Sequence, residues 1–125
     1  MNRSLLAWIG RLSFRQYITK KEHKYGIKYF ELTTSGRLIL RICIYTAERF
    51  EDPEGLRQSG ATVLQLMRDF VHQGYQVFMD NWYNSVKLVK SLSEIATYVC
   101  GTLNPRQLRR PKKLIGLKLK KNELV

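Results

Sequence analysis

The fold is decided by one stretch in the second half of the chain, Gln76-Val77-Phe78-Met79-Asp80-Asn81-Trp82-Tyr83-Asn84-Ser85. An apolar run ends there in a carboxylate, two aromatic residues and a polar pair follow, and a helical pattern begins at Val86. In α/β sheets, side chains at the carboxyl end of a strand lie at the rim, where helices and loops leave a crevice. Asp80 is therefore the first candidate for a functional residue.

The sequence before this stretch predicts a β-hairpin and a helix. Residues 26–34 and 37–46 have the composition of two strands, and the second should be more buried because its apolar residues are nearly continuous. Ser35-Gly36 between them predicts a two-residue turn in which the glycine takes a positive φ. Residues 60–72 predict an amphipathic helix that stops at Gly74. Its buried stripe consists of Val63, Leu64, Met67, Phe70 and Val71.

The sequence after the stretch predicts a second helix and a last strand. The helix covers residues 84–95, with Asn84 or Ser85 as its N-cap. Val86, Val89 and Leu92 fall on one side of it. Residues 97–101 then have the pattern of a strand. The whole order implies an α/β fold with a mixed sheet, in which an antiparallel hairpin comes first and a parallel strand–helix–strand unit carries Asp80.

Charge favours a polyanionic partner. Lysine and arginine together number 22 against 10 aspartates and glutamates, which gives a net charge of +12. Such a surplus favours nucleic acid or an anionic membrane face, although a solvated basic surface without a partner also fits. No apolar run reaches the ~18 residues of a membrane span, which argues against insertion into a membrane. Cys43 and Cys100 lie in apolar runs and are interpreted as buried free thiols, with a disulfide between them as the alternative.

Basic residues gather toward both ends of the chain. From Asn104 onward, Pro105 and Pro111 interrupt regular structure, and eight basic residues follow without an acid among them. Contact with phosphate groups is the leading interpretation, and such contacts depend on salt but not on base sequence. The expected nucleic-acid-binding residues are Arg11, Arg15, Lys20, Lys21, Arg106, Arg109, Arg110, Lys112, Lys113, Lys118, Lys120 and Lys121, with Lys24 and Lys28 also on the N-terminal side.

Several segments, in this order and spacing, resemble one family. They are Gly10-Arg11-Leu12-Ser13-Phe14-Arg15-Gln16-Tyr17-Ile18, Lys24-Tyr25-Gly26-Ile27-Lys28, Asp80-Asn81-Trp82-Tyr83-Asn84-Ser85 and Gly101-Thr102-Leu103, followed by Arg109, Pro111 and Lys118-Leu119-Lys120-Lys121. Together they make nearly the whole chain similar to the catalytic domain of piggyBac-type transposases and of the proteins derived from them.

The resemblance implies an RNase H-like fold that is truncated at both ends. Residues 1–103 correspond to part of the catalytic domain, and residues 104–125 to a basic tail that begins the family's inserted subdomain. In this family three aspartates hold two Mg²⁺ ions for DNA strand cleavage and joining. Asp80 matches the second aspartate and is thus an ancestral metal ligand. Asn2 stands at the position of the first, Arg3 stands where a glutamate is expected, and the third would lie beyond Val125.

The resemblance therefore implies a protein without catalytic activity of its own. Asn2 lacks the charge that holds Mg²⁺, and Arg3 adds a repelling positive charge beside it. We expect no productive cofactor binding, mostly non-specific electrostatic binding to DNA and, by analogy with the family, a nuclear location. A protein partner could also cover an exposed face of the sheet. Two alternatives are a domesticated DNA- or protein-interaction module without catalysis, and an active transposase from an incomplete gene model.

The aromatic pair after Asp80 has two interpretations. Trp82 and Tyr83 either pack beside the end of the strand or stack on an unpaired base. Packing is the favoured interpretation.

Overall fold

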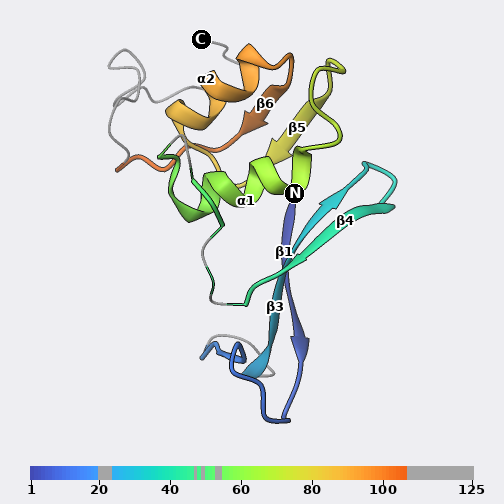
Figure 1. Cartoon of the computed structure of the whole chain (residues 1–125), viewed down its shortest axis with the longest axis vertical. Coiled ribbons are helices and arrows are strands. Elements are labelled where there is room, and N and C mark those ends of the chain that lie inside the picture. Colours follow the sequence, from blue (N-terminus) through green and yellow to red (C-terminus); the bar gives the residue numbers. More distant parts are fainter. Residues whose placement is uncertain (20–23, 47, 49, 53–54, 107–125) are drawn as a thin grey trace, which may run out of the picture.

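The chain forms two small sheets and two helices. The computed structural model describes residues 1–19, 24–46, 48, 50–52 and 55–106. Strands β1 and β3 run side by side in the lower half of Figure 1, and both helices lie in the upper half with β5 and β6. In chain order the elements are β1 (Asn2–Ala7), β2 (Gln16–Tyr17), β3 (Tyr25–Thr33), β4 (Ile39–Ile44), α1 (Arg57–Met67), β5 (Gln76–Met79), α2 (Val86–Glu94) and β6 (Tyr98–Gly101).

The antiparallel sheet is built around β3, the longest strand. β3 pairs with β1, with the short β2 and with β4, and all three pairings are antiparallel. The register places Arg3 opposite Phe30 and Phe30 opposite Cys43. A bulge between Leu32 and Thr33 shifts the pairing with β4 near the end of the hairpin. The N-terminal strand is thus fixed against the middle of the sheet.

The parallel sheet consists of β5 and β6, which α2 connects. Phe78 pairs with Cys100, and Met79 pairs with Gly101. The α/β class is therefore confirmed, with the antiparallel part first and the parallel part leading into Asp80. Among the described residues the two parts form separate sheets, and the Met1 nitrogen bridges them by donating to the Phe78 carbonyl oxygen at 2.7 Å.

The hydrophobic core lies between the inner face of β3 and the two helices. Phe30 is fully buried there, as are Val63 and Leu66 of α1 and Leu88 and Leu92 of α2. Further core residues are Leu32, Leu56, Met67, Val77, Met79 and Tyr83. The core therefore holds the antiparallel sheet and the parallel unit together, although no strand ladder joins them in the described part of the chain.

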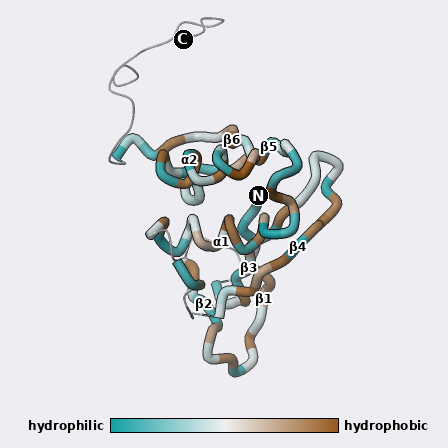
Figure 2. Tube along the Cα trace, turned by 45° about the horizontal axis from the view of Figure 1, so that its top comes forward, coloured by the Kyte–Doolittle hydropathy of each residue, from teal (hydrophilic) through white to brown (hydrophobic). Residues whose placement is uncertain are grey.

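The expectation that the second strand of the hairpin is more buried than the first is wrong. β3, not β4, is the buried strand, and Figure 2 shows hydrophobic residues along the exposed β4. Ile42 and Ile44 are 50% and 52% exposed. A run of apolar residues cannot tell a central strand from an outer one. β4 pairs with β3 alone, and its outward face has no covering element among the described residues.

The hairpin turn also differs from the expected two-residue form. Thr34 and Leu38 close it, because the Thr34 nitrogen donates to the Leu38 carbonyl at 2.9 Å. The three residues between them form the loop, and Arg37 rather than Gly36 takes the positive φ, 66°. The Thr34 hydroxyl accepts from the Leu38 nitrogen at 3.1 Å and so supports this geometry. A three-residue loop with its last residue left-handed is the next common hairpin after the two-residue kind.

The first helix starts and ends earlier than the sequence predicted. The Asp52 carboxylate accepts from the Leu56 nitrogen at 2.5 Å and from the Arg57 nitrogen at 2.8 Å, which satisfies two amides at the helix start. Gly60 thus lies inside α1 rather than at its beginning. The helix ends at Met67, and Phe70 beyond it is half-buried against the core.

The second helix follows the prediction more closely. Ser85 is the N-cap, and its hydroxyl accepts from the Leu88 nitrogen at 3.2 Å. Leu88 and Leu92 are the fully buried residues, whereas Val86 and Val89 are only half-buried. The buried stripe is therefore rotated relative to the expected one.

Both cysteines are free thiols, so the alternative disulfide does not form. Cys43 is half-buried, and burial raises the pKa of its thiol. Cys100 is exposed, contrary to expectation, because among the described residues β6 pairs with β5 alone and lies at the edge of a two-stranded sheet. In the part of the chain that the structure describes, no helix is long and apolar enough to cross a membrane.

The expected domain boundary at residue 103 stays a prediction, because residues 107–125 lie outside the described part.

Truncation in the core should cost far more stability than truncation on β4. Leu92→Ala removes a side chain that is 0% exposed, and we expect a loss of about 2–5 kcal/mol in the free energy of unfolding. Ile44→Ala is the matched control, for which we expect less than about 1 kcal/mol. Urea unfolding followed by tryptophan fluorescence measures both. Equal losses would contradict this assignment of the core.

Candidate metal and nucleic-acid site at the end of strand β5

Asp80 is the first residue after β5 and is held by a tight turn. Its Oδ1 accepts from the Trp82 nitrogen at 2.9 Å, and its carbonyl accepts from the Asn84 nitrogen at 3.2 Å. β6 lies close beside this end of β5, because Gly101 has no Cβ to clash with the Met79 carbonyl. The expected location of Asp80 at the rim of the parallel strands is therefore what the structure shows.

Arg3 of β1 pairs with the other oxygen of this carboxylate. The distance between Arg3 Nη2 and Asp80 Oδ2 is 2.5 Å, and the two side chains are 36% and 46% exposed. Both carboxylate oxygens of Asp80 thus have a donor within the protein. The positive charge of the Arg3 guanidinium therefore lies directly beside this carboxylate.

Aromatic rings support the Arg3 guanidinium. Its central carbon lies 5.0 Å from the centroid of the Trp82 ring and 6.0 Å from that of Tyr83. Trp82 stacks on Phe30 at 5.3 Å with an interplanar angle of 15°. Cation–π contacts of this kind favour a positive charge over the ring faces. The ion pair is consequently held in place from two sides.

Tyr83 packs as expected, and it also ties β1 to the turn after β5. It is 1% exposed, so it cannot stack on a base, and its hydroxyl donates to the Asn2 carbonyl at 2.8 Å. Burial is the main cause that raises the pKa of this phenol, and Arg3 opposes the shift. Trp82 is half-buried and packs on Phe30, in line with the packing interpretation.

A second cation, Lys28 of β3, lies beside the same rings. Its Nζ is 5.3 Å from the centroid of Phe30, 5.1 Å from that of Tyr45 and 5.3 Å from that of Trp82. Burial lowers the pKa of Lys28, and the nearby Arg3 lowers it further. Arg3 and Lys28 therefore bring two side-chain cations to the same group of aromatic rings.

Asn2 lies next to the site but contributes no charge. Its Oδ1 accepts from the Arg3 nitrogen at 2.9 Å, and the register of β1 places it opposite Glu31. Successive side chains of a strand point to opposite faces, so Asn2 and Arg3 face opposite ways. Sequence analysis did not consider Glu31, which is 8% exposed and accepts from the Ser4 hydroxyl at 3.0 Å.

Two other acids near the helices have structural partners. Asp52 caps α1, and Asp69 forms an ion pair with Arg41. Within residues 1–19, 24–46, 48, 50–52 and 55–106, no three His, Cys, Asp or Glu side chains gather to form a metal-binding group.

Only some of the expected phosphate-binding residues lie in the described part of the chain. Arg11, Arg15 and Arg106 are exposed. Arg15 also has a structural role, because it donates to the Ile9 carbonyl at 2.9 Å and lies 4.6 Å from the ring centroid of Tyr25. Outside the described residues are Lys20, Lys21, Arg109, Arg110, Lys112, Lys113, Lys118, Lys120 and Lys121.

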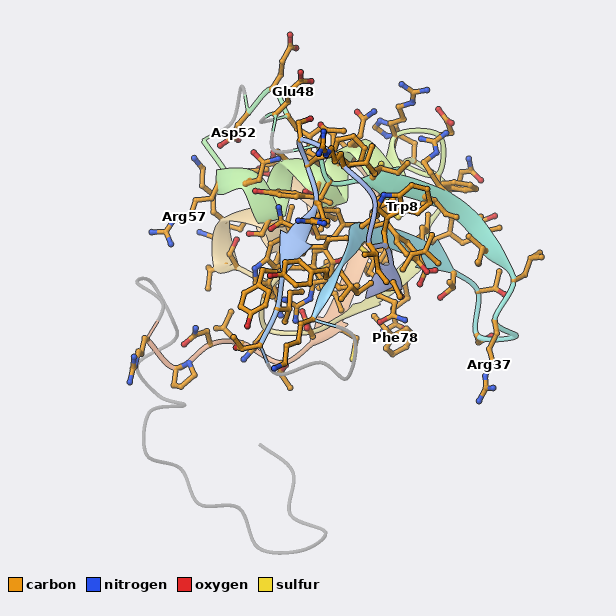
Figure 3. All side chains as sticks on the ribbon, turned by 90° about the horizontal axis from the view of Figure 1, so that it is seen from below. Trp8, Arg37, Glu48, Asp52, Arg57 and Phe78 are labelled. Atoms are coloured by element: carbon orange, nitrogen blue, oxygen red, sulfur yellow. The ribbon has the colours of Figure 1, made fainter. Side chains whose placement is uncertain are left out.

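A basic hollow next to the Asp80 turn was missed by sequence reasoning. It has a volume of about 750 Å³, and Trp82 and Asn81 form part of its wall. Three basic residues line it, Arg57 at the start of α1, Lys87 in the first turn of α2, and Arg106, and no acid does. These cations are far apart in sequence, so only the fold brings them together. Figure 3 shows Arg57 on the opposite side of the molecule from Arg37.

Comparison with known proteins identifies relatives of the entire chain. A family model described as Transposase IS4 matches residues 1–125. The chain is also similar to the piggyBac transposase in a cryo-EM structure of its synaptic complex with hairpin DNA, with a TM-score of 0.80 and 26% sequence identity. This similarity covers 96% of the present chain and 26% of the other, so the chain spans about a quarter of the length of that transposase. The resemblance inferred from the sequence and the RNase H-like fold class are thereby confirmed.

The Arg3–Asp80 pair should be modestly stabilising. Because both side chains are partly exposed, a double-mutant cycle with Arg3→Met and Asp80→Asn should give a coupling of about 0.5–1 kcal/mol in urea unfolding. The control pair is Arg68 and Asp69, which are 3.5 Å apart and 63% and 55% exposed, and it should give a coupling close to zero. A repulsive or absent coupling between Arg3 and Asp80 would show that they do not pair in solution.

Proposed function

Because the chain belongs to the Transposase IS4 family, we propose that it is a transposase-derived DNA-binding protein that no longer catalyses strand cleavage. The main support for a loss of catalysis is the contact between Arg3 and Asp80. The observation that supports DNA binding is the basic hollow beside them, in a chain with a net charge of +12.

The loss of catalysis follows from charge. Two hard divalent ions need several oxygen ligands that converge on them, and in two-metal sites they clamp the attacking and leaving oxygens. At this site one carboxylate, Asp80, already accepts from a guanidinium and from a backbone amide. A Mg²⁺ ion would have to displace Arg3 and bind close to its positive charge. The residues present therefore do not fit the family's metal pair.

DNA binding requires fewer conditions than catalysis. Arg57, Lys87 and Arg106 line a concave surface without an acid, and such a surface attracts phosphate groups regardless of base sequence. The related piggyBac transposase was solved in a complex with hairpin DNA, which agrees with this proposal. By analogy with the family, the proposed place of action is the nucleus.

A second candidate function is a protein-interaction module. It is favoured by the outward face of β4, where Ile42 and Ile44 are half exposed on the outer strand of the sheet. Contiguous apolar surface of this kind is typical of interaction sites. It requires neither catalysis nor DNA.

DNA affinity should depend steeply on salt. The logarithm of the association constant for a fluorescent duplex should fall linearly with the logarithm of salt concentration, by about 0.9 per phosphate contact. Arg57→Gln should reduce this slope by about 0.9, the contribution of one phosphate contact, because it removes one cation from the hollow. The control, Arg37→Gln, removes the same charge from the far side of the molecule and should leave the slope nearly unchanged. A flat salt response would refute electrostatic binding, and equal effects of the two variants would refute the hollow as its location.

Magnesium should neither stabilise the chain nor support cleavage. We expect the same melting temperature with and without millimolar Mg²⁺, both for the natural chain and for Asp80→Asn, because Arg3 already occupies the carboxylate. A supercoiled plasmid incubated with the protein and Mg²⁺ should stay intact. A Mg²⁺-dependent rise in melting temperature that Asp80→Asn abolishes, or nicking of the plasmid, would show that the site still binds metal.

A further inference from the structure

Three aromatic residues lie in a row across one end of the antiparallel sheet. Tyr17 of β2 pairs with Tyr25 of β3. On the other side of β3, the β1 ladder continues beyond Ala7, since the Trp8 nitrogen donates to the Tyr25 carbonyl oxygen at 3.2 Å. Residues directly opposite each other in an antiparallel pair belong to the same face of a sheet. The three side chains therefore share one face, at the foot of the molecule in Figure 1 and remote from both helices.

All three rings of this row are accessible from outside. Tyr17, Tyr25 and Trp8 are 55%, 47% and 43% exposed. Side chains as large and apolar as that of tryptophan are usually buried to a much greater extent. Large apolar groups that are exposed together on one face are typical of an interaction site.

Local contacts hold the rings in defined positions. The Tyr17 and Tyr25 rings touch, with centroids 4.9 Å apart and planes tilted by 49°. The Arg15 guanidinium lies 4.6 Å from the Tyr25 centroid and is itself anchored by a hydrogen bond to the loop after β1. The Trp8 indole packs on Gly10, where a Cβ would come within 2.7 Å of its Nε1. A surface that is preorganised in this way loses less conformational entropy when a ligand binds.

The charge around the row is positive. In residues 8–28 the sequence has six basic residues and one acid, Glu22. Of the basic residues, Arg11, Arg15 and Lys24 are exposed in the described part of the chain. Aromatic rings bordered by cations match a polyanion that carries flat rings of its own. An uncharged proline-rich peptide could use the rings but would make no use of the cations.

We propose that this aromatic platform, formed by Trp8, Tyr17 and Tyr25, binds an unpaired strand of nucleic acid. Bases stack on the exposed rings of Trp8 and Tyr17, while Arg11 and Lys24 contact phosphate groups. Stacking of this kind tolerates any base, because every base has a π face. A duplex fits less well, since its bases already stack on one another. The inference goes beyond the proposed function, which places phosphate contacts in the basic hollow beside α1 and α2, at the other end of the molecule in Figure 1.

The test compares two probes of equal charge. One is a fluorescein-labelled, twelve-nucleotide oligothymidylate, and the other is an abasic strand with the same number of phosphates. Fluorescence anisotropy with the full chain should show the oligothymidylate binding at least about tenfold more tightly, because only its bases can stack. A matching oligouridylate identifies the preferred polymer, and a preference for either RNA or DNA agrees with the proposal.

Two tyrosines provide a matched pair of variants. Tyr17 in the platform and Tyr98 on β6 are both 55% exposed. Tyr17→Leu should weaken oligothymidylate binding at least about fivefold, the loss expected for one stacked base, whereas Tyr98→Leu should change it less than about twofold. Trp8→Leu should act like Tyr17→Leu, which guards against misfolding of one variant. It should also abolish the quenching of tryptophan fluorescence by the oligothymidylate, although Trp82 is still present.

Three results would overturn the proposal. They are equal binding of the oligothymidylate and the abasic strand, equal weakening by Tyr17→Leu and Tyr98→Leu, and displacement of the oligothymidylate by an uncharged proline-rich peptide. Tyr17→Leu and Trp8→Leu leave the net charge unchanged, so duplex affinity and its salt slope should stay as they are. Loss of duplex binding with the preference over the abasic strand intact would remove only the earlier proposal, and the reverse would remove only this one.

Discussion

The structure depends on the contact between Phe30 and the aromatic pair that follows β5. Phe30 lies in the middle of the antiparallel sheet, stacks on Trp82 and meets the edge of Tyr83 at 6.1 Å between ring centroids. No strand ladder joins the two sheets in the described part of the chain. This aromatic contact and the packing of the helices therefore do much to hold the two sheets together. It also fixes the place of the Asp80 turn relative to β1. The position of every charged group at the site follows from that arrangement.

Once β1 and the Asp80 turn are adjacent, the charge of residue 3 decides the character of the site. A carboxylate there would repel Asp80 unless a cation came between them, and a guanidinium removes that need. Arg3 also gains the faces of Trp82 and Tyr83, which a carboxylate would not. The residue at position 3 thus makes Asp80 part of an ion pair within the protein.

Much of this arrangement could be predicted from the sequence. The apolar run up to Met79, the Ser85 cap and the order of strands and helices give the α/β class, because each rests on local periodicity and capping. Three features could not be predicted. The deeper burial of β3 than of β4 depends on which strand lies in the centre of the sheet. The left-handed conformation of Arg37 and the capping of α1 by Asp52 depend on loop geometry. Asp80 and Asn2 were found through their neighbours in sequence. The Arg3 contact and the basic hollow join residues more than 18 positions apart, and no sequence period connects these.

The ion pair also bears on the order in which the chain can fold. Arg3 and Asp80 are separated by 77 residues, whereas β3 and β4 are joined by a short hairpin and β5 and β6 by a single helix. Contacts across long chain separations cost more loop-closure entropy and are slower to form. During synthesis, the hairpin can form while the residues of β5 have not yet been added. The N-terminal strand must then wait until Asp80 has been added before the charge of Arg3 is neutralised, which makes this docking a later step of folding than formation of the hairpin.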